Sequence, residues 1–222
     1  DKPQAAQIQT SLNQAFRNLF LGGMADGMQP VEALGLFNDF RDLTPLGADG
    51  DEMVRRIVRR LVDVDLLDQA ATLLQYQIDN RLQGVAKASV ASDLAAIYLM
   101  DRNPQKALQA LWNTRTTLLP KTVMQERRVL EARALIELGQ PDKALDSLGN
   151  DTSVDGNDVR ADIYWAQKDW GKAAGILEKQ LGDRYKTDKP LAIADEGRLI
   201  RAGVAYSLLK DQDALVYVLS LD

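Results

Sequence analysis

The stretch RNPQKALQAL at residues 102–111 returns 37 residues later as GQPDKALDSL at residues 139–148. Both copies contain the triplet Lys-Ala-Leu, with a proline three residues before its alanine and a leucine four residues after it. Self-similarity at an interval of about 20–50 residues is typical of folds that stack one small structural unit several times. The two copies therefore raise the question of how far this repeat extends along the chain.

The alanine of the triplet has counterparts along most of the chain. Steps of 37 residues lead back from Ala107 to Ala70 and Ala33 and forward to Ala144, and two further steps of 29 and 41 residues follow. We call the six residues the anchor alanines: Ala33, Ala70, Ala107, Ala144, Ala173 and Ala214. The residue four positions after each anchor is large and apolar: Phe37, Leu74, Leu111, Leu148, Leu177 and Val218. Because residues four apart share one face of a helix, each anchor is expected to lie on the buried face of a helix.

A second set of small residues precedes the anchors. Twelve positions before an anchor, four of the six residues are alanine: Ala95, Ala132, Ala161 and Ala202. Small residues are expected where two helices cross closely, so each anchor helix is predicted to pair with the helix before it. A single helix pair cannot bury its apolar face, and neighbouring pairs are therefore expected to stack.

This pattern resembles the tetratricopeptide repeat, whose signature is W-x2-L-G-x2-Y…A-x3-F…P. The best match is Leu94-Ala95-x2-Tyr98…Ala107-x3-Leu111, and Ala33-x3-Phe37 followed by Pro45 matches the second half. The resemblance implies an all-α fold, a right-handed α-solenoid of about six antiparallel helix pairs that forms a single domain over residues 1–222. It is a resemblance to repeat domains found in long bacterial proteins, and the chain is interpreted as a C-terminal or excised part of such a protein.

The periodicity also predicts where the helices lie. They are expected over residues 5–22, 30–42, 51–63, 66–81, 85–101, 104–116, 122–139, 141–149, 156–168, 170–181, 191–209 and 211–220. Asp51 is expected to cap the third of these helices, and Asp155 or Asp158 the ninth.

Composition excludes several classes of function. The net charge is −5, which disfavours nucleic acid and anionic membrane surfaces as partners. The chain has no histidine and no cysteine, which excludes thiol catalysis, Ser-His triads and the common zinc sites. No apolar run approaches the roughly 18 residues of a membrane span, so no membrane insertion is expected. We therefore expect neither enzymatic activity nor a cofactor nor a metal.

Two motifs that suggest ligands are better explained by local structure. The glycine-rich stretch GGMADG at residues 22–27 lacks the lysine and the preceding strand of a phosphate loop, so it is interpreted as a helix end and turn. The acidic stretches at residues 49–52 and 151–158 lack the twelve-residue ligand spacing of a calcium loop.

The stretch RRIVRR at residues 55–60 is the densest charge cluster, and two interpretations remain open. It is either a solvated helix face balanced by nearby acids, or a clamp for an acidic segment or a chain terminus. Forked guanidinium groups bind carboxylates well, which supports the second interpretation.

In proteins that this chain resembles, the first helix of each pair lines a concave groove, and its inward positions can be transferred by offset from the anchors. The resemblance implies a wall on which Arg55, Arg59 and Arg133 hold acidic groups. It implies an opposite end with Asp162 and with Trp165 and Tyr206 as anchors for an apolar residue. The inward positions of the third repeat are Ser89, Ser92, Ala96 and Leu99, and Asp158 is an inward position of the fifth.

Two functions are consistent with these features. The first is a non-enzymatic scaffold that binds a protein or peptide in the concave groove. The second is a structural spacer, or a domain that self-associates through its terminal helices, within a larger bacterial envelope or cytoskeletal protein. An exposed apolar face on the first or last helix would favour the second function, because terminal repeats normally present polar caps. The lack of cysteine fits an oxidising compartment such as the bacterial periplasm, but many cytoplasmic proteins also lack it.

Overall fold

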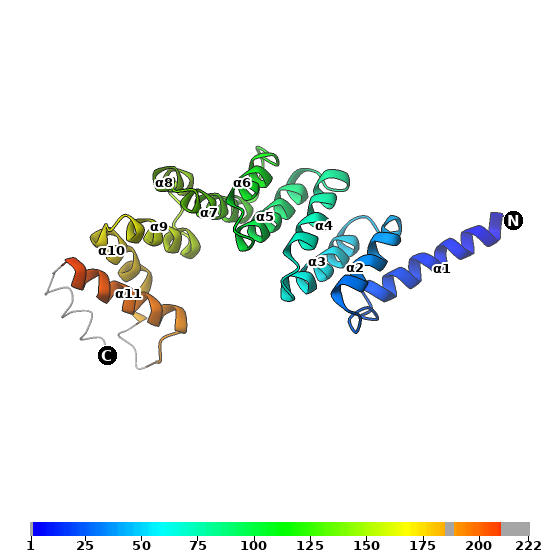
Figure 1. Cartoon of the computed structure of the whole chain (residues 1–222), viewed down its shortest axis with the longest axis horizontal. Helices are drawn as coiled ribbons and strands as arrows, with labels where there is room; N and C mark the ends of the chain where they lie inside the picture. The colour runs from blue at the N-terminus through cyan, green and yellow to red at the C-terminus, as the bar shows by residue number, and fades with distance from the viewer. Residues whose placement is uncertain (1, 185–188, 210–222) are drawn as a thin grey trace. The chain divides into compact units, whose positions relative to one another are not determined.

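A computed structural model describes residues 2–184 and 189–209 of the chain, and these residues form helices and connections without any β-strand (Figure 1). The predicted all-helical class is therefore confirmed for this part of the chain. The elements are α1 (Lys2–Phe20), α2 (Pro30–Asp39), η1 (Arg41–Leu43), α3 (Ala48–Asp63), α4 (Leu67–Asn80), α5 (Gly84–Met100), α6 (Pro104–Trp112), α7 (Lys121–Glu137), α8 (Pro141–Leu148), α9 (Val154–Ala166), α10 (Trp170–Leu181) and α11 (Ile193–Leu209). The helix expected over residues 211–220 lies outside the described residues, as do Ala214 and Val218.

Most predicted helices are present, but several of their ends differ from the prediction. The helix α3 begins at Ala48 after Gly47, so Asp51 lies inside its first turns and does not cap it. The helix α9 is capped by Ser153, whose hydroxyl accepts a hydrogen bond from the Gly156 amide, so neither Asp155 nor Asp158 is the cap. These corrections share one reason, since a cap depends on the backbone conformation of one residue and not on its charge alone.

The helix α6 ends at Trp112, four residues before the predicted end. The hydroxyl of Thr114 donates to the carbonyl of Ala110 at 2.8 Å, a local bond that competes with continuation of the helix.

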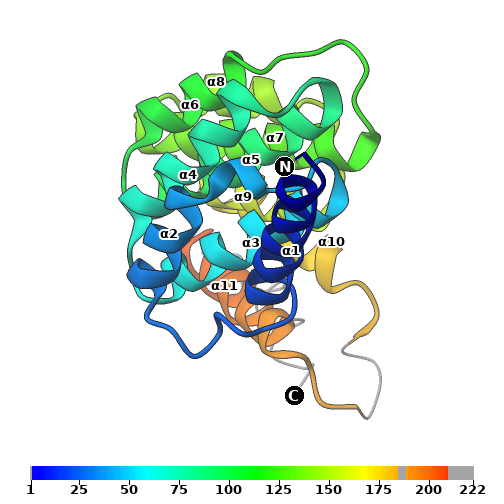
Figure 2. The same ribbon diagram turned by 90° about the vertical axis from the view of Figure 1, so that its right-hand side faces the viewer.

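The chain divides into two compact units, Asp1–Asn103 and Pro104–Asp222. In the first unit α2 packs on α3, α3 on α4, and α4 on α5, and Figures 1 and 2 both show α2 beside α3. In the second unit α6 packs on α7, α7 on α8 and α9, α9 on α10, and α10 on α11. Within each unit, helices that follow one another in the sequence are therefore also neighbours in space.

The anchor alanines occupy the core, as the repeat predicts. Ala70, Ala107, Ala144 and Ala173 have no exposed surface, and Ala33 is 1% exposed. The apolar partners four residues later are also buried: Phe37, Leu74, Leu111, Leu148 and Leu177. The alanines twelve positions before the anchors are fully buried as well: Ala95, Ala132, Ala161 and Ala202. The prediction of a buried anchor face is confirmed for every anchor that the structure describes.

In the second unit, small residues let three helices meet. Ala161 of α9 and Ala202 of α11 share one buried cluster with Leu177 of α10, and Ile176 packs against it. A methyl side chain at both alanine positions allows the two helices to close on the leucine. Larger side chains at either position would overpack this cluster.

At the other end of the chain, an aromatic cluster fixes the second half of α1. The ring centres of Phe16 and Phe20 lie 4.8 Å apart. The ring centre of Phe37 on α2 lies 5.8 Å from that of Phe16 and 5.5 Å from that of Phe20. In contrast, residues 4–15 of α1 are exposed, including Ile8 at 61% and Leu12 at 44%. The apolar stripe of α1 is therefore covered over only part of its length.

Arginine side chains fix several connections through main-chain carbonyl groups. Arg56 and Arg60 of α3 donate to the carbonyls of Leu21 and Ala25 at 2.8 and 2.9 Å, which secures the connection between α1 and α2. Charged donors make stronger hydrogen bonds than neutral ones, and the last carbonyls of a helix favour a nearby cation.

The second unit has the most deeply buried example of this contact. Arg127 of α7 is 7% exposed and donates to the carbonyl of Leu111, in the last turn of α6, and to the Thr114 hydroxyl at 3.1 Å. Burial lowers the pKa of Arg127 from its usual high value. The guanidinium thereby adds a charged donor to the Leu111 carbonyl, which also accepts hydrogen bonds from the amide and the hydroxyl of Thr114.

Candidate peptide-binding groove

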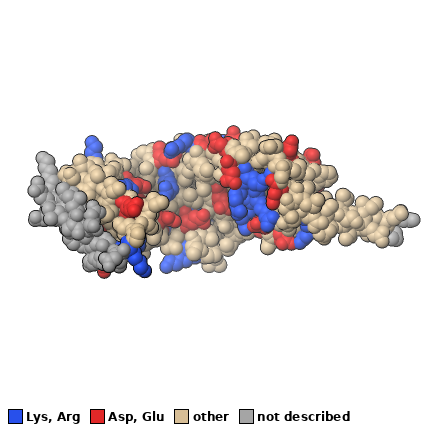
Figure 3. Space-filling view, turned by 90° about the horizontal axis from the view of Figure 1, so that it is seen from below, with Lys and Arg blue, Asp and Glu red and all other residues tan. Residues whose placement is uncertain are grey.

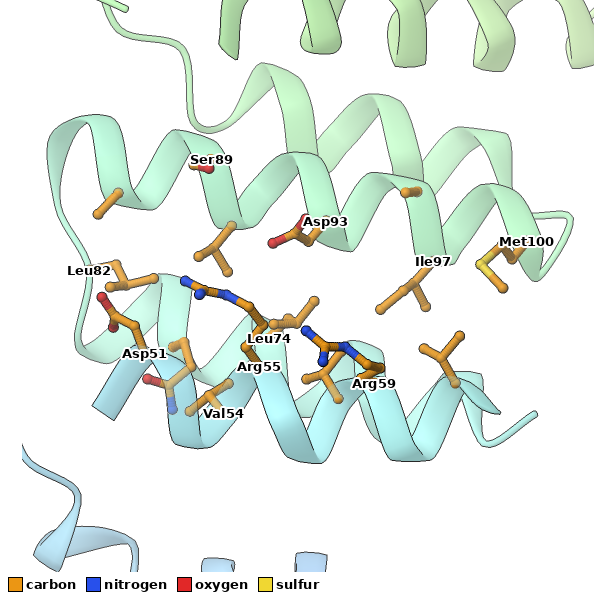
Figure 4. A pocket seen from close by; sticks show the side chains of 16 residues that line it. Asp51, Val54, Arg55, Arg59, Leu74, Leu82, Ser89, Asp93, Ile97 and Met100 are labelled. Atoms are coloured by element: carbon orange, nitrogen blue, oxygen red, sulfur yellow. The ribbon is translucent and has the colours of Figure 1, made fainter. Parts of the chain in front are cut away.

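An open groove of about 640 Å³ lies within the first unit. The helices α3 and α5 form its two walls, and α4 supplies part of its floor through Leu74 and Gln77 (Figure 4). Both residues are only 4% exposed, so they lie at the bottom of the groove. The groove is therefore a concave site between two helices of the first unit.

Helical spacing explains which side chains of α3 line the groove. Val54 and Val58 are buried where α3 faces the core, and Arg55 and Arg59 follow each of them by one residue. Since successive residues turn by about 100° around a helix, the two arginines lie one turn apart at the edge of the buried face. Figure 4 shows both side chains directed into the space between α3 and α5.

The four arginines of residues 55–60 thus divide between two sides of α3. Arg56 and Arg60 hold the connection before α2, whereas Arg55 and Arg59 line the groove. Figure 3 shows a patch of basic side chains bordered by acidic ones in the region of α3, on the face turned to the viewer. Neither sequence interpretation holds for the whole cluster, because one pair is structural and the other faces open space.

The two groove arginines differ in their partners. Arg55 pairs with Glu52 at 3.1 Å, and Glu52 also accepts from Arg56 at 3.0 Å. These contacts, with the Arg56 hydrogen bond as the largest, lower the pKa of Glu52 below its usual value. Arg59 is exposed and makes no hydrogen bond or ion pair with any residue that the structure describes. Arg59 is therefore the basic group of the groove that is most available to a ligand.

The opposite wall carries an acid that sequence reasoning missed. Asp93 of α5 lines the groove, is exposed, and forms no hydrogen bond or ion pair within the described part of the chain. The surrounding groove walls desolvate its carboxylate and raise the pKa of Asp93, while the charge of Arg55 opposes this change. A raised pKa in a concave site marks a group whose charge is incompletely compensated.

The transferred offsets placed Ser92 on the inward face, but Ser92 is fully buried and its hydroxyl donates to the Ala88 carbonyl. The groove face of α5 instead runs through Ser89, Asp93, Ala96 and Met100. Two of the four transferred positions therefore shift by one residue, about 100° around the helix, from Ser92 to Asp93 and from Leu99 to Met100. The helical spacing would have allowed Asp93 as an alternative, but only the packing of α5 on α4 decides between the two residues.

The three arginines of the predicted wall belong to different units, so the wall stays a prediction. Arg133 lines a second, smaller groove of about 440 Å³ in the second unit, together with Glu126 and Val129 of α7 and Asp155 of α9. Arg133 is exposed, and no described residue forms a hydrogen bond or ion pair with it. Arg55 and Arg59 thus line one groove of the first unit, and Arg133 lines a groove of the second unit.

Asp162, Trp165 and Tyr206 are engaged within the second unit. Arg201 of α11 pairs with Asp162 at 2.8 Å, and its guanidinium lies 5.0 Å from the Trp165 ring centre. The Tyr206 hydroxyl donates to the Glu178 carboxylate of α10. Each of these three predicted residues thus contacts a neighbouring helix of the second unit.

A second ion pair joins α9 to α11. Arg198 is 13% exposed and donates twice to Asp158, at 3.2 and 2.9 Å, and once to Asp195 at 2.9 Å. The hydrogen bond with Asp158 is the largest cause that raises the pKa of Arg198. Asp158, an inward position by offset, is therefore neutralised by a neighbouring helix.

No membrane-spanning helix and no cluster of three or more metal-ligating side chains occurs among the residues that the structure describes. Comparison of the chain with models of protein families, with curated proteins and with solved structures finds no match.

Proposed function

We propose that the chain is a helical repeat module of the tetratricopeptide type, a right-handed α-solenoid, that binds a segment of another protein without catalysing a reaction. The repeated anchors in the sequence support the solenoid, as does the packing of consecutive helices within each unit. The absence of histidine and cysteine from the whole chain supports a non-catalytic role.

One observation carries the binding role, namely that Arg59 has no hydrogen bond or ion pair with any described residue and stands in a concave site that Leu74 and Ile97 also line. Ligand pockets of proteins have volumes of about 300–1,000 Å³ and combine apolar walls with a few placed polar groups. The α3–α5 groove matches both criteria, because Leu74 and Ile97 line it together with Arg55 and Arg59. Guanidinium groups bind carboxylates through paired hydrogen bonds, so the favoured ligand is a peptide with an acidic residue next to apolar ones.

The test is a binding screen followed by substitution of the arginines. An array of capped peptides that vary in acidic and apolar content is screened, and the affinity of the best binder is measured by calorimetry. The double variant Arg55→Ala, Arg59→Ala should weaken binding by about 1–3 kcal/mol for each charged hydrogen bond lost. Raised salt should also weaken binding to the unaltered protein, since an open groove is screened within about 8–10 Å.

The control is Arg128→Ala, which removes an arginine from an exposed position on α7 outside the groove. The affinity of this control variant for the peptide should equal that of the unaltered protein. If the double variant keeps full affinity, the α3–α5 groove is not the binding site and the second groove around Arg133 becomes the place to test.

The alternative function, self-association, is favoured by the exposed apolar stripe of α1. Ile8 and Leu12 are 61% and 44% exposed on a helix that has no charged residue between positions 4 and 16. Sedimentation at several concentrations should reveal a dimer that the double variant Ile8→Gln, Leu12→Gln abolishes. A monomer at every concentration would remove this alternative.

A further inference from the structure

We propose that the α3–α5 groove recognises a dipolar peptide segment, in which an acidic residue faces Arg59 on one wall and an adjacent basic residue faces Asp93 on the other. This inference rests on the proposed function, because it requires that a peptide bind in this groove. It goes further by naming a basic residue in the ligand and a protein side chain that selects for it.

The two walls carry opposite charges. Figure 4 shows Arg55 and Arg59 on α3 and Asp93 on α5, on opposite sides of the same space. Arg59 and Asp93 lie too far apart to form an ion pair with each other, and the described residues give neither of them any other hydrogen-bonding partner. An acidic ligand group alone would satisfy Arg59 but would leave Asp93 uncompensated and would be repelled by it.

The surroundings of Asp93 favour a cation over a neutral donor. The groove walls desolvate the carboxylate, and the opposing charge of Arg55 does not cancel this effect. A ligand ammonium or guanidinium group adds both a hydrogen bond and a compensating charge, which a neutral donor does not. The same cation would remove the repulsion between Asp93 and the acidic residue of the ligand.

An extended peptide presents this arrangement with adjacent residues. Side chains at successive positions of an extended chain point to opposite sides, so a Glu-Lys dipeptide directs one charge to each wall. Asp51 to Val62 on α3 corresponds to about 16 Å of helix at ~1.5 Å per residue. At ~3.3 Å per residue, the groove spans roughly five residues of extended chain. This leaves room for an apolar residue beside Ile97 and Met100.

The experiment uses four capped peptides that carry Glu-Lys, Glu-Gln, Gln-Lys or Gln-Gln before one leucine in an otherwise glycine and serine sequence. Affinities are measured by NMR titration with the whole chain, with Asp93→Asn, with Arg59→Gln and with Asp146→Asn. Asp146 is exposed on α8 in the second unit, so its variant removes the same charge as Asp93→Asn from outside the groove.

With the unaltered chain, Glu-Lys should bind about two- to fivefold more tightly than Glu-Gln, as expected for a partly exposed ion pair. This advantage of lysine should vanish in Asp93→Asn and persist in Asp146→Asn. The advantage of glutamate over glutamine should vanish in Arg59→Gln.

Three results would overturn the inference, and they are distinguishable. If glutamate is preferred through Arg59 but lysine brings no advantage, or an advantage that Asp93→Asn leaves intact, the dipolar ligand is wrong and the proposed function stands. If none of the four peptides and no peptide of the array binds, the proposed function fails and this inference fails with it.

Discussion

Gly50 shows how a single side-chain carbon can decide whether α3 begins where it does. The residue lies buried in the first turn of α3, and a β-carbon built on it would collide with the carbonyl oxygen of Pro45. Because that oxygen belongs to the main chain, it cannot rotate away. We expect Gly50→Ala to lower the free energy of unfolding by about 1–3 kcal/mol, measured by urea unfolding and far-UV circular dichroism.

The matched control is Gly35→Ala in the interior of α2, where a β-carbon has no atom within 4 Å. Alanine favours a helix interior over glycine by roughly 0.5–1 kcal/mol, so this variant should be slightly more stable than the unaltered protein. Equal effects of the two variants would contradict the contact with Pro45 as the cause.

Arg127 and its sequence neighbour Arg128 allow another comparison at the scale of single residues. Its guanidinium is buried and satisfies the Leu111 carbonyl and the Thr114 hydroxyl, whereas the next residue, Arg128, is exposed. We expect Arg127→Ala to cost about 1–3 kcal/mol of unfolding free energy, because it removes two buried hydrogen bonds from a charged donor. Thermal unfolding of Arg128→Ala should match the unaltered chain, and a similar loss in both variants would exclude this explanation.

At the scale of single residues, the sequence predicts small core positions well and arginine roles poorly. The anchor alanines recur at fixed offsets from large apolar residues, so the sequence itself identifies them as buried. Arg55 and Arg56 differ by one position, and nothing local distinguishes them. Their roles depend on a main-chain carbonyl at Leu21, which only the fold brings close to Arg56.

At the scale of elements, the pairing of α9 with α11 gives each acid of the predicted acidic end of the groove a partner within the second unit. Asp158 and Asp162 are one turn apart on α9, and Arg198 and Arg201 are spaced to match on α11. The offsets from the anchors locate the acids but give no information on which helix faces them. Charge pairs between helices distant in sequence therefore remained outside the prediction.

The coupling of α9 to α11 can be measured with a double-mutant cycle on Asp158 and Arg198. Both side chains are largely covered and joined by two hydrogen bonds, so Asp158→Asn, Arg198→Gln and their combination should reveal a coupling of about 1 kcal/mol or more in urea unfolding. The pair Asp169 and Lys172 is exposed and provides the control, for which we expect no measurable coupling. Equal coupling in both cycles would contradict a special role for the first pair.

The buried carboxylate of Asp195 on α11 makes a contribution to stability that depends on pH. Arg184 most strongly, and then Arg198, lower the pKa of Asp195 in the folded chain below its unfolded value of about 3.9. The contribution is therefore fully present above about pH 4 and is lost as the pH falls through the lower folded pKa. The difference in unfolding free energy between the unaltered chain and Asp195→Asn should be constant above about pH 5 and shrink below pH 4. A difference that grows on acidification would reverse the assigned sign.

At the scale of the whole molecule, the repeat and the packing lead to different expectations for the number of domains. The anchors recur across the boundary between Asn103 and Pro104 without a change of interval, and the sequence therefore predicts one domain over residues 1–222. The contacts group the chain into two compact units with their limit at this boundary, and the single domain stays a prediction. The interval between anchors and the offsets of their neighbours describe single helix pairs. They do not tell how tightly one helix pair packs on the next, so the sequence gives no sign of a boundary between Asn103 and Pro104.

This difference can be tested with the fragment of residues 1–103. The whole lining of the α3–α5 groove lies between Asp51 and Met100, and the aromatic cluster around Phe37 lies in the same unit. The anchors Ala33 and Ala70 are buried by helices of this unit as well. We expect the fragment to be helical by circular dichroism, to unfold cooperatively in urea, and to bind the Glu-Lys peptide as the whole chain does. A continuous solenoid predicts the opposite, because removal of the following repeats would expose the face of α5 and destabilise the end of the stack. An unfolded fragment, or one that folds but loses the peptide, would therefore favour a single domain in which later repeats support the groove.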